Sequence, residues 1–193
     1  MPDSTEHELI VRAQAGEHRA FGLLVGRYQN RIFRFVLRLC NSRDQAMDLT
    51  QDTFMKAHQA LAGWRPEAQF KSWLFRIAHN ATLDELRRRR CVDFVPLPEP
   101  GVDGAGAELQ STAPQPDQQI ADWQRIELLD RVLRRLPAEQ RDVLLLREVE
   151  GMSYAEISLT LGLEEGTVKS RLARARLAAL AGYQKATGEN VHD

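Results

Sequence analysis

The chain has 193 residues, of which 43% are hydrophobic and 27% charged, and its formal net charge is −1. This balance allows one folded domain or two small ones, and it excludes a wholly basic nucleic-acid binder while permitting a local basic patch. No apolar run approaches the ~18 residues that suggest a membrane span, and the opening residues MPDSTEHELI lack the order of a secretory signal. Cys40 and Cys91 form no CxxC motif, which predicts free thiols in a reducing cytoplasm.

Residues 1–91 show apolar side chains at spacings of three and four, which predicts a series of helices. In AFGLLVGRYQNRIFRFVLRLC the apolar stripe runs from Phe21 to Leu39. In DQAMDLTQDTFMKAHQAL, Asp48, Gln51 and Asp52 lie close together on the polar side. Both segments therefore read as amphipathic helices of one small domain.

A third segment, FKSWLFRIAHNATLDELRRRR, and the loop before it, AGWRPEAQ, combine aromatic, amide and arginine side chains. The residues concerned are Trp64, Arg65, Lys71, Ser72, Trp73, Arg76 and Asn80. Such a mixture suits unstacked single-stranded bases, which offer faces for stacking and edges for hydrogen bonds. The alternative is that the aromatic side chains fill the core and that the arginine run at 87–90 complements the helix dipole.

Residues 92–121 contain five prolines and three glycines but no Lys or Arg. This composition predicts an extended, poorly ordered linker between an N-terminal block and a C-terminal block at 122–193. Neither block shows the alternation of a β-strand. The predicted fold class is therefore all-α, with two small helical domains joined by a flexible linker.

The C-terminal block contains the motif MSYAEISLTLGLEEGTVKSRLARAR. Ser153 and Glu156 form a capping box, so a helix is expected to begin there and to run to Leu161. Gly162 permits a left-handed turn, and a second helix is expected to begin near residues 164–165. Two short helices joined in this way make a helix-turn-helix, whose second helix enters the major groove of DNA. Upstream, IELLDRVLRRLPAEQRDVLLLREVEG predicts two more helices, divided by Pro137.

The second helix of this motif has a polar and basic outer face. At about 100° per residue, Val168, Leu172 and Ala175 point inward. The outward residues are Lys169, Ser170, Ala173 and Arg174. Arg and Lys reach phosphates and guanine edges, Ser bonds bases or phosphates, and Ala contacts a thymine methyl. The alternative is a solvated basic helix without a partner.

Four segments carry a more specific signal than any single motif. They are AQAGEHRAFGLLVGRYQNRIFRFV, DLTQDTFMKAHQAL, FKSWLFRIAHN and LPAEQRDVLLLREVEGMSYAEISLTLGLEEGTVKSRLARAR. In this order they resemble the bacterial extracytoplasmic-function (ECF) sigma factors of the RpoE-like group in the sigma-70 family. The resemblance covers nearly the whole chain and implies sigma region 2 at 1–91, a linker at 92–121 and sigma region 4 at 122–193.

The resemblance also implies a function, partners and site residues. It implies an alternative sigma factor that directs RNA polymerase core to promoters, is held by an anti-sigma factor, and has no enzyme activity or cofactor. Residues implied to bind core polymerase, at its β′ clamp helices, are Asp48, Gln51, Asp52 and Phe54. Residues implied to bind the −10 element are Trp64, Arg65, Lys71, Ser72, Trp73, Arg76 and Asn80. Residues implied to bind the −35 element are Thr167, Lys169, Ser170, Arg171, Ala173, Arg174 and Arg176. The β flap of polymerase is a further expected partner, and Arg171 and Arg176 are expected to contact phosphates or to form pairs within their domain.

Two other classes of protein remain as alternatives. A simple DNA-binding regulator predicts a dimer on a two-fold operator, but it leaves the aromatic and arginine residues at 64–90 without a role. An enzyme is disfavoured because the five histidines show no metal-ligand spacing and the chain has no glycine-rich phosphate loop. Cys40 lies in an apolar helical pattern and is expected to be packed, and His79 is assigned with Asn80 to the DNA face.

Overall fold

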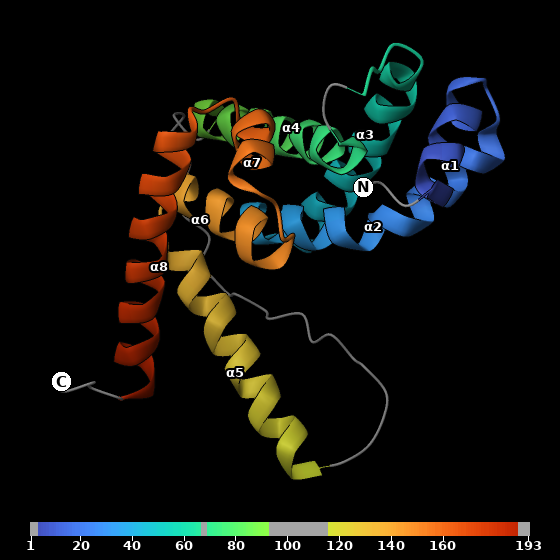
Figure 1. Ribbon diagram of the computed structural model, residues 1–193. Helices are drawn as coiled ribbons and strands as arrows, with labels where there is room; N and C mark the ends of the chain where they lie inside the picture. Colours follow the sequence, from blue (N-terminus) through green and yellow to red (C-terminus); the bar gives the residue numbers. More distant parts are fainter. Residues whose placement is uncertain (1–3, 67–68, 93–115, 189–193) are drawn as a thin grey trace.

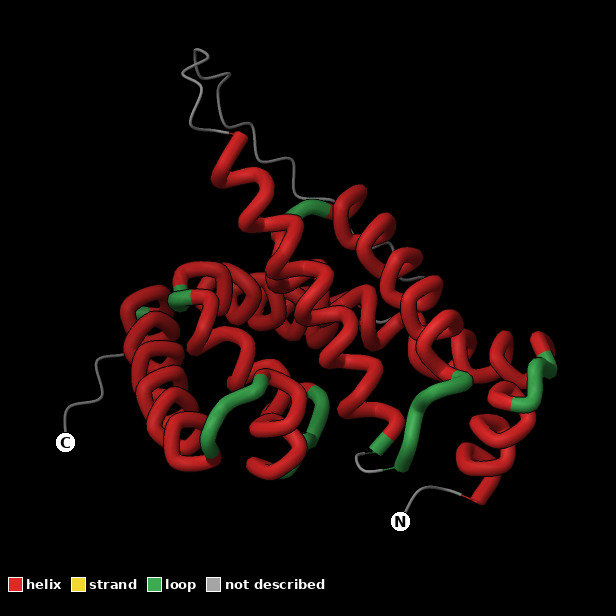
Figure 2. The backbone as a smooth tube through the Cα atoms, turned by 90° about the horizontal axis from the view of Figure 1, so that it is seen from above, coloured by secondary structure: helices red, strands yellow, loops and turns green. Residues whose placement is uncertain are grey.

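The computed structural model describes residues 4–66, 69–92 and 116–188. Within these ranges the chain forms helices and loops, with no strand, so the predicted all-α class is confirmed (Figures 1 and 2). The helices are α1 (Ser4–Gln14), α2 (His18–Cys40), α3 (Arg43–Leu61), α4 (Phe70–Val92), α5 (Pro116–Arg135), α6 (Ala138–Leu144), the π-helix η1 (Leu145–Val149), α7 (Tyr154–Leu161) and α8 (Glu165–Thr187). Within the described residues, none of these helices is long and apolar enough to cross a membrane.

The N-terminal half is built around α2, which packs against α1, α3 and α4. Its apolar stripe is buried, with Leu24 and Ile32 almost inaccessible to solvent. Asn41 adopts the left-handed conformation, with φ 58°, and ends the helix. Ser42 then accepts a hydrogen bond from the Gln45 backbone N–H and begins α3. Helix α1 is an element that the sequence pattern had not indicated.

The C-terminal half follows the predicted local signals. Pro137 separates α5 from α6 because it has no N–H to continue a helix. Ser153 and Glu156 form both hydrogen bonds of the capping box at the start of α7. Gly162 ends α7 with φ 67°, a conformation that glycine adopts without a steric penalty, and α8 begins three residues later. The helix-turn-helix prediction is therefore confirmed.

The segment between the halves is only partly described. Residues 93–115 of the predicted linker lie outside the described residues. Helix α5 begins at Pro116, which places residues 116–121 in a helix and not in an extended linker. The aspartate, glutamines and isoleucine that follow Pro116 are compatible with a helix. The start of α5 was not predicted because the prolines of the segment favour a linker.

The two halves contact each other directly. Helix α7 packs against α4, and α2 contacts both α5 and α6 (Figure 1). Buried Arg141 of α6 donates hydrogen bonds to the carbonyl oxygens of Arg38 (3.0 Å) and Leu39 (3.4 Å) at the end of α2. It also donates to the carbonyl oxygens of Arg134 (2.9 Å) and Leu136 (3.1 Å), so one guanidinium joins the two halves.

Candidate nucleic-acid interface and partner groove

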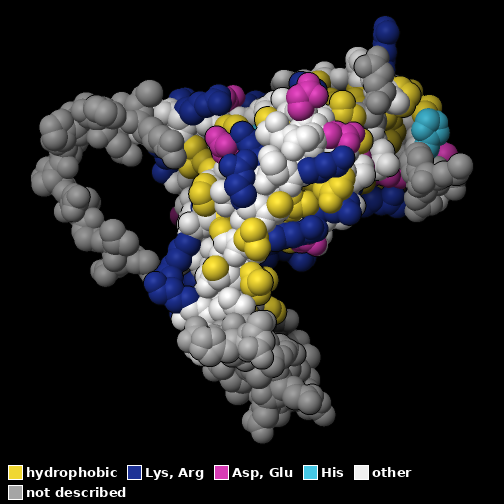
Figure 3. All heavy atoms as spheres, turned by 60° about the vertical axis from the view of Figure 1, so that its left-hand side comes forward, with side chains coloured by type: hydrophobic (Ala, Val, Ile, Leu, Met, Phe, Trp, Pro, Cys, Tyr) yellow, Lys and Arg dark blue, Asp and Glu magenta, His cyan; other side chains and the backbone are white. Residues whose placement is uncertain are grey.

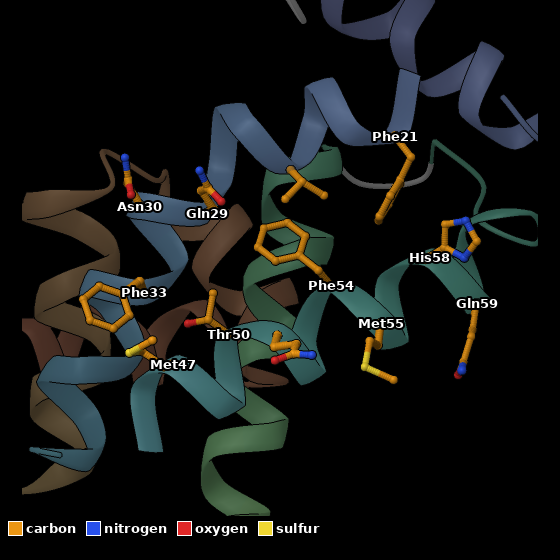
Figure 4. A pocket seen from close by; sticks show the side chains of 12 residues that line it. Phe21, Gln29, Asn30, Phe33, Met47, Thr50, Phe54, Met55, His58 and Gln59 are labelled. Carbon is orange, nitrogen blue, oxygen red and sulfur yellow. The ribbon is translucent and has the colours of Figure 1, made fainter. Parts of the chain in front are cut away.

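A groove of about 770 Å³ lies between α2 and α3 (Figure 4). Its apolar lining includes Phe21, Phe33, Phe54 and two exposed methionines, Met47 and Met55. Exposed methionines are adaptable contacts that suit a helix laid into a groove.

The residues predicted to bind polymerase lie in this groove or beside it. Gln51 and Phe54 line the groove. Asp48 and Asp52 are exposed on α3, one helical turn apart, so their carboxylates share one face. An apolar groove beside a helix that also carries exposed acids is complementary to a helix with apolar and basic side chains.

The loop before α4 is held by an aromatic cluster. The ring centroids of Trp64 and Phe70 are 5.9 Å apart, those of Trp64 and Trp73 are 6.0 Å apart, and those of Phe70 and Trp73 are 5.4 Å apart. The Gln14 side chain in α1 donates hydrogen bonds to the carbonyl oxygens of Leu61 (3.1 Å) and Trp64 (2.8 Å). These contacts tie Leu61 and Trp64 to α1, which therefore has a role that its sequence did not show.

A pocket of about 340 Å³ opens beside this cluster. Its lining residues are Gly63, Trp64, Arg65, Ser72, Trp73, Arg76 and Leu159. Most residues predicted to bind the −10 element are therefore brought together around one cavity, whereas Lys71 and Asn80 do not line it. In such a pocket a base can stack on a tryptophan ring while a phosphate pairs with a neighbouring arginine.

Two of the predicted −10 residues are engaged with the C-terminal half. The Lys71 ammonium donates a hydrogen bond to the Glu150 carbonyl oxygen. Burial and the neighbouring Arg31 charge lower the pKa of Lys71. The Ser72 hydroxyl donates to a Glu156 carboxylate oxygen at 3.4 Å, and Ser72 is only 1% exposed. The C-terminal half therefore covers the end of α4 that carries Lys71 and Ser72.

His79 does not lie with Asn80 on an exposed face. Asn80 is exposed, but His79 is 6% exposed and its Nε2 lies 2.9 Å from the Asp142 carboxylate of α6. The assignment of His79 to the DNA face was wrong, because adjacent residues of a helix point about 100° apart and this one meets the other half of the chain.

Helix α8 presents the face that the helical pattern predicted. Val168, Leu172 and Ala175 are buried, at 0%, 1% and 0% exposure. The residues on the outer face, all exposed, are Lys169, Ser170, Ala173 and Arg174. Figure 3, which brings the α8 side of the molecule forward, shows several groups of Lys and Arg side chains with acidic ones between them. This face is available to duplex DNA in the free chain.

The other two arginines of α8 form pairs within their own half. Arg171 lies 2.9 Å from a Glu139 carboxylate oxygen, and Arg176 lies 2.6 Å from one of Glu148. The hydrogen bonds that Arg176 donates to Glu148 raise the pKa of Arg176. The Arg176 pair is solvent-exposed and Arg171 is partly buried, while its partner Glu139 is exposed, so each arginine can exchange its partner for a phosphate.

Cys40 is packed, as the sequence predicted. It is half-buried, its thiol donates a hydrogen bond to the Ser42 carbonyl oxygen at 3.3 Å, and burial raises its pKa. A raised pKa lowers the thiolate fraction at neutral pH, which makes the thiol a poor nucleophile. Among the described residues, no group of His, Cys, Asp and Glu side chains is arranged to hold a metal ion.

Some residues around the site were not identified from the sequence. They are Arg31, Asp142, Glu150 and Leu159. Leu159 lines the pocket with predicted −10 residues. Arg31 pairs with Glu150, and Asp142 pairs with His79, across the two halves. Arg31 and Glu150 are 119 positions apart. No periodic pattern within either half indicates such a pair.

Comparison with known proteins gives a consistent picture. Residues 24–91 match the family described as Sigma-70 region 2, and residues 126–178 match Sigma-70 region 4. The chain is 34% identical to the RNA polymerase sigma-H factor of Pseudomonas aeruginosa, covering 90% of this chain and 91% of that protein. It is 35% identical to the ECF RNA polymerase sigma factor SigM of Mycobacterium tuberculosis, covering 98% of this chain and 90% of that protein.

Solved structures are also similar. CnrH, solved in complex with the cytosolic domain of CnrY, superposes with a TM-score of 0.66 at 28% identity and covers 92% of this chain and 96% of that chain. The sigma factor RpoE of Bartonella quintana, solved with the anti-sigma factor NepR, gives a TM-score of 0.65 at 28% identity. That match covers 85% of this chain and 96% of the other.

Proposed function

The chain belongs to the extracytoplasmic-function RNA polymerase sigma factors, and on that premise we propose that it directs bacterial RNA polymerase core to specific promoters as an alternative sigma factor. The observation that carries the proposal is the presence, in one chain, of an aromatic and arginine pocket in region 2 and an exposed basic recognition helix in region 4. The first suits an opened strand and the second suits a duplex. A simple repressor needs only the second.

In this proposal, region 4 reads the −35 element as duplex DNA. Lys169, Ser170, Ala173 and Arg174 face the major groove, where a bidentate arginine distinguishes guanine from other bases. Arg171 and Arg176 exchange their glutamate partners for phosphates. These contacts position the chain on the promoter before any base pair opens.

Region 2 then captures the −10 element as a single strand. A base that leaves the stack is received between the Trp64 and Trp73 side chains, while Arg65 and Arg76 pair with the backbone. Asn80 lies on the same helix and extends the contact along the strand. The protein is therefore a binding subunit without enzyme activity of its own, and it acts in the cytoplasm with no cofactor.

Core polymerase supplies most of the affinity. The groove between α2 and α3, with Asp48 and Asp52 at its edge, receives the β′ clamp helices, and region 4 contacts the β flap. Near-zero net charge limits attraction of the free chain to DNA, because its 27 acidic residues offset its 26 basic ones. An anti-sigma factor is a further proposed partner, since the Bartonella quintana relative is solved with one.

Co-elution with bacterial core polymerase on a sizing column tests this proposal. The native chain is expected to co-elute and to give defined start sites on a promoter library. Asp48→Arg combined with Asp52→Arg is expected to abolish co-elution, because two repulsive charges then face the partner helix. Glu8→Arg with Asp84→Arg is the matched control, with the same charge change at exposed positions away from the groove. Specific DNA binding by a dimer without co-elution would instead support a simple regulator.

A further inference from the structure

We propose that Met47 and Met55, which line the groove between α2 and α3, are sites at which a peroxide oxidises methionine to its sulfoxide, and that this modification weakens the binding of core polymerase. The inference rests on the proposed function for the identity of the partner, because it assigns regulation to the same groove. The site of oxidation depends on the chain alone.

The three methionines whose side chains the structure describes differ in exposure. Met47 and Met55 are 57% and 53% exposed, and both line the groove (Figure 4). Met152 is 0% exposed, and its sulfur accepts a hydrogen bond from the Thr160 hydroxyl at 3.9 Å. Because oxidation of a thioether follows its exposure, a peroxide is expected to react at the two groove methionines and to spare the buried one.

The two exposed thioethers belong to one row of side chains along α3. The row has a member at every fourth residue, and all of its members line the groove: Met47, Gln51, Met55 and Gln59. Side chains four residues apart are neighbours on the surface of a helix. Both thioethers therefore lie where a helix that occupies the groove covers them.

A sulfoxide is tolerated in the free chain but not under a partner. The thioether is apolar and adaptable, whereas the sulfoxide carries an oxygen that accepts hydrogen bonds. In the free chain water solvates that oxygen, because both side chains are more than half exposed. Under a partner helix the oxygen loses water, which costs free energy wherever its new neighbours are apolar, as at Phe33 and Phe54. Oxidation is therefore expected to weaken binding without destabilising the fold.

The reaction is a two-electron oxidation, with hydrogen peroxide as the oxidant. The sulfur lone pair bonds to one peroxide oxygen while the O–O bond breaks. The proton on that oxygen moves to the departing hydroxide, and water leaves. The sulfur is oxidised and the peroxide is reduced, so no other group of the chain is consumed. Methionine sulfoxide reductases reverse the change.

Thiol chemistry is separated from this reaction by substitution. Cys40 is half-buried, and burial raises its pKa, which lowers the fraction of reactive thiolate. It does not line the groove. The test chain carries Cys40→Ala and Cys91→Ser, so that the loss of binding after treatment reports on thioethers and not on thiols.

Peptide mass spectrometry after treatment with hydrogen peroxide locates the oxidation. Met47 and Met55 are expected to form sulfoxide about tenfold faster than Met152, or more. Saturating core polymerase is expected to slow the reaction at both, because the partner covers them. Equal rates at the three sulfurs would overturn the inference, as would equal rates at Met47 and Met55 with and without polymerase.

The Kd for core polymerase is measured on the same chain before and after treatment, with the peroxide removed before mixing. It is expected to rise about tenfold or more. Reductases that act on both sulfoxide epimers are expected to restore it. The urea midpoint of unfolding should be the same before and after treatment, because the fold does not bury these side chains. An unchanged Kd in a chain with sulfoxide at both positions would overturn the inference.

Met47→Leu combined with Met55→Leu removes both thioethers. The readout is the ratio of the Kd values after and before treatment within each chain, so any effect of the substitutions on binding itself cancels. This ratio is expected to fall to about one in the double variant, whereas Met152→Leu, the matched control, should keep the ratio of the parent chain. Equal ratios in the double variant and its parent would overturn the inference. If the untreated chain fails to bind polymerase, the proposed function and its regulation are both contradicted, while the sulfoxide yields still decide which methionines are modified.

Discussion

The two surfaces that we assign to promoter DNA differ in how the fold presents them. The −35 surface lies on the outer face of α8, where Arg174 and its neighbours are exposed; Arg174 bonds within its own helix, and Lys169 lies over the Tyr154 ring of α7. The −10 surface lies against α7, where Ser72 is 1% exposed and Lys71 bonds to Glu150. Duplex DNA is always present, whereas an opened strand exists only at a polymerase. The difference teaches that one predicted DNA surface is exposed on the C-terminal half, while the other also forms part of the contact between the two halves.

Arg141→Ala is expected to have the largest effect, because it removes the guanidinium that joins α6 to the end of α2. Four carbonyl hydrogen bonds are lost from a buried site, and the free energy of unfolding should fall by about 3 kcal/mol. Urea denaturation measures this change. Arg135→Ala, an exposed arginine at the end of α5, is the control and should change stability by less than about 0.5 kcal/mol. Equal stability of the two variants would mean that the contact between the halves is weak.

Arg174→Ala should affect the exposed surface alone. It is expected to weaken binding of polymerase to −35 duplex DNA by about 1–3 kcal/mol and to relax sequence preference at one or two positions. Unfolding should not change, since this side chain packs against nothing outside its helix. Binding-site selection measures the preference, with Lys185→Ala in the last turn of α8 as the control. A selected sequence identical to that of the native chain would remove Arg174 from the reading face.

Ser153→Ala should have the smallest effect, and it should act on α7, which packs against α4. The loss of the α7 cap is expected to cost about 1 kcal/mol of unfolding free energy at neutral pH. Urea denaturation measures this change. The comparison variant is Ser158→Ala, which removes a different hydrogen bond of α7, from the Ser158 hydroxyl to the Leu163 carbonyl oxygen. An unfolding free energy of Ser153→Ala equal to that of the native chain would contradict the role of the cap.

The same cap gives a dependence on pH. Burial raises the pKa of Glu156, but hydrogen bonds from the Ser153 backbone and side chain outweigh burial and hold that pKa below its ordinary 4.5. The carboxylate therefore stabilises the folded state above pH 4.5, and this contribution is lost as the pH falls through the lower pKa of the folded state. The difference in unfolding free energy between native and Ser153→Ala chains should shrink over that range. A difference that is constant down to pH 3 would contradict this reasoning.

Local signals explain how much of the fold the sequence could predict. The capping box at Ser153, the turn at Gly162 and the break at Pro137 each act within a few residues, so each could be located from the pattern. The inward and outward faces of α8 follow from the same short-range geometry. Helix α1 was missed because its apolar spacing is weak, and its function depends on Gln14 reaching a loop 47 to 50 residues away.

The candidate site was predicted less completely than the fold. Several residues predicted from their types around Trp64 and Trp73 line one pocket, and the predicted Gln51 and Phe54 of α3 line the groove. The pattern could not show that His79 faces Asp142 or that Arg31 meets Glu150, because those pairs join segments 63 and 119 residues apart. Contacts between halves depend on the three-dimensional arrangement and leave no period in the sequence.

Site-specific photocrosslinking tests the contrast between the two surfaces most directly. A photoreactive amino acid is placed at Trp73 in one chain and at Ala173 in another, and each is irradiated with promoter DNA with and without core polymerase. We predict that position 173 crosslinks to −35 duplex DNA weakly without polymerase and strongly with it, and that position 73 crosslinks to the −10 strand only with polymerase. No crosslink from position 73 in the polymerase complex would contradict its assignment to the −10 element, and an equally strong crosslink from position 73 in the free chain would contradict the requirement for polymerase.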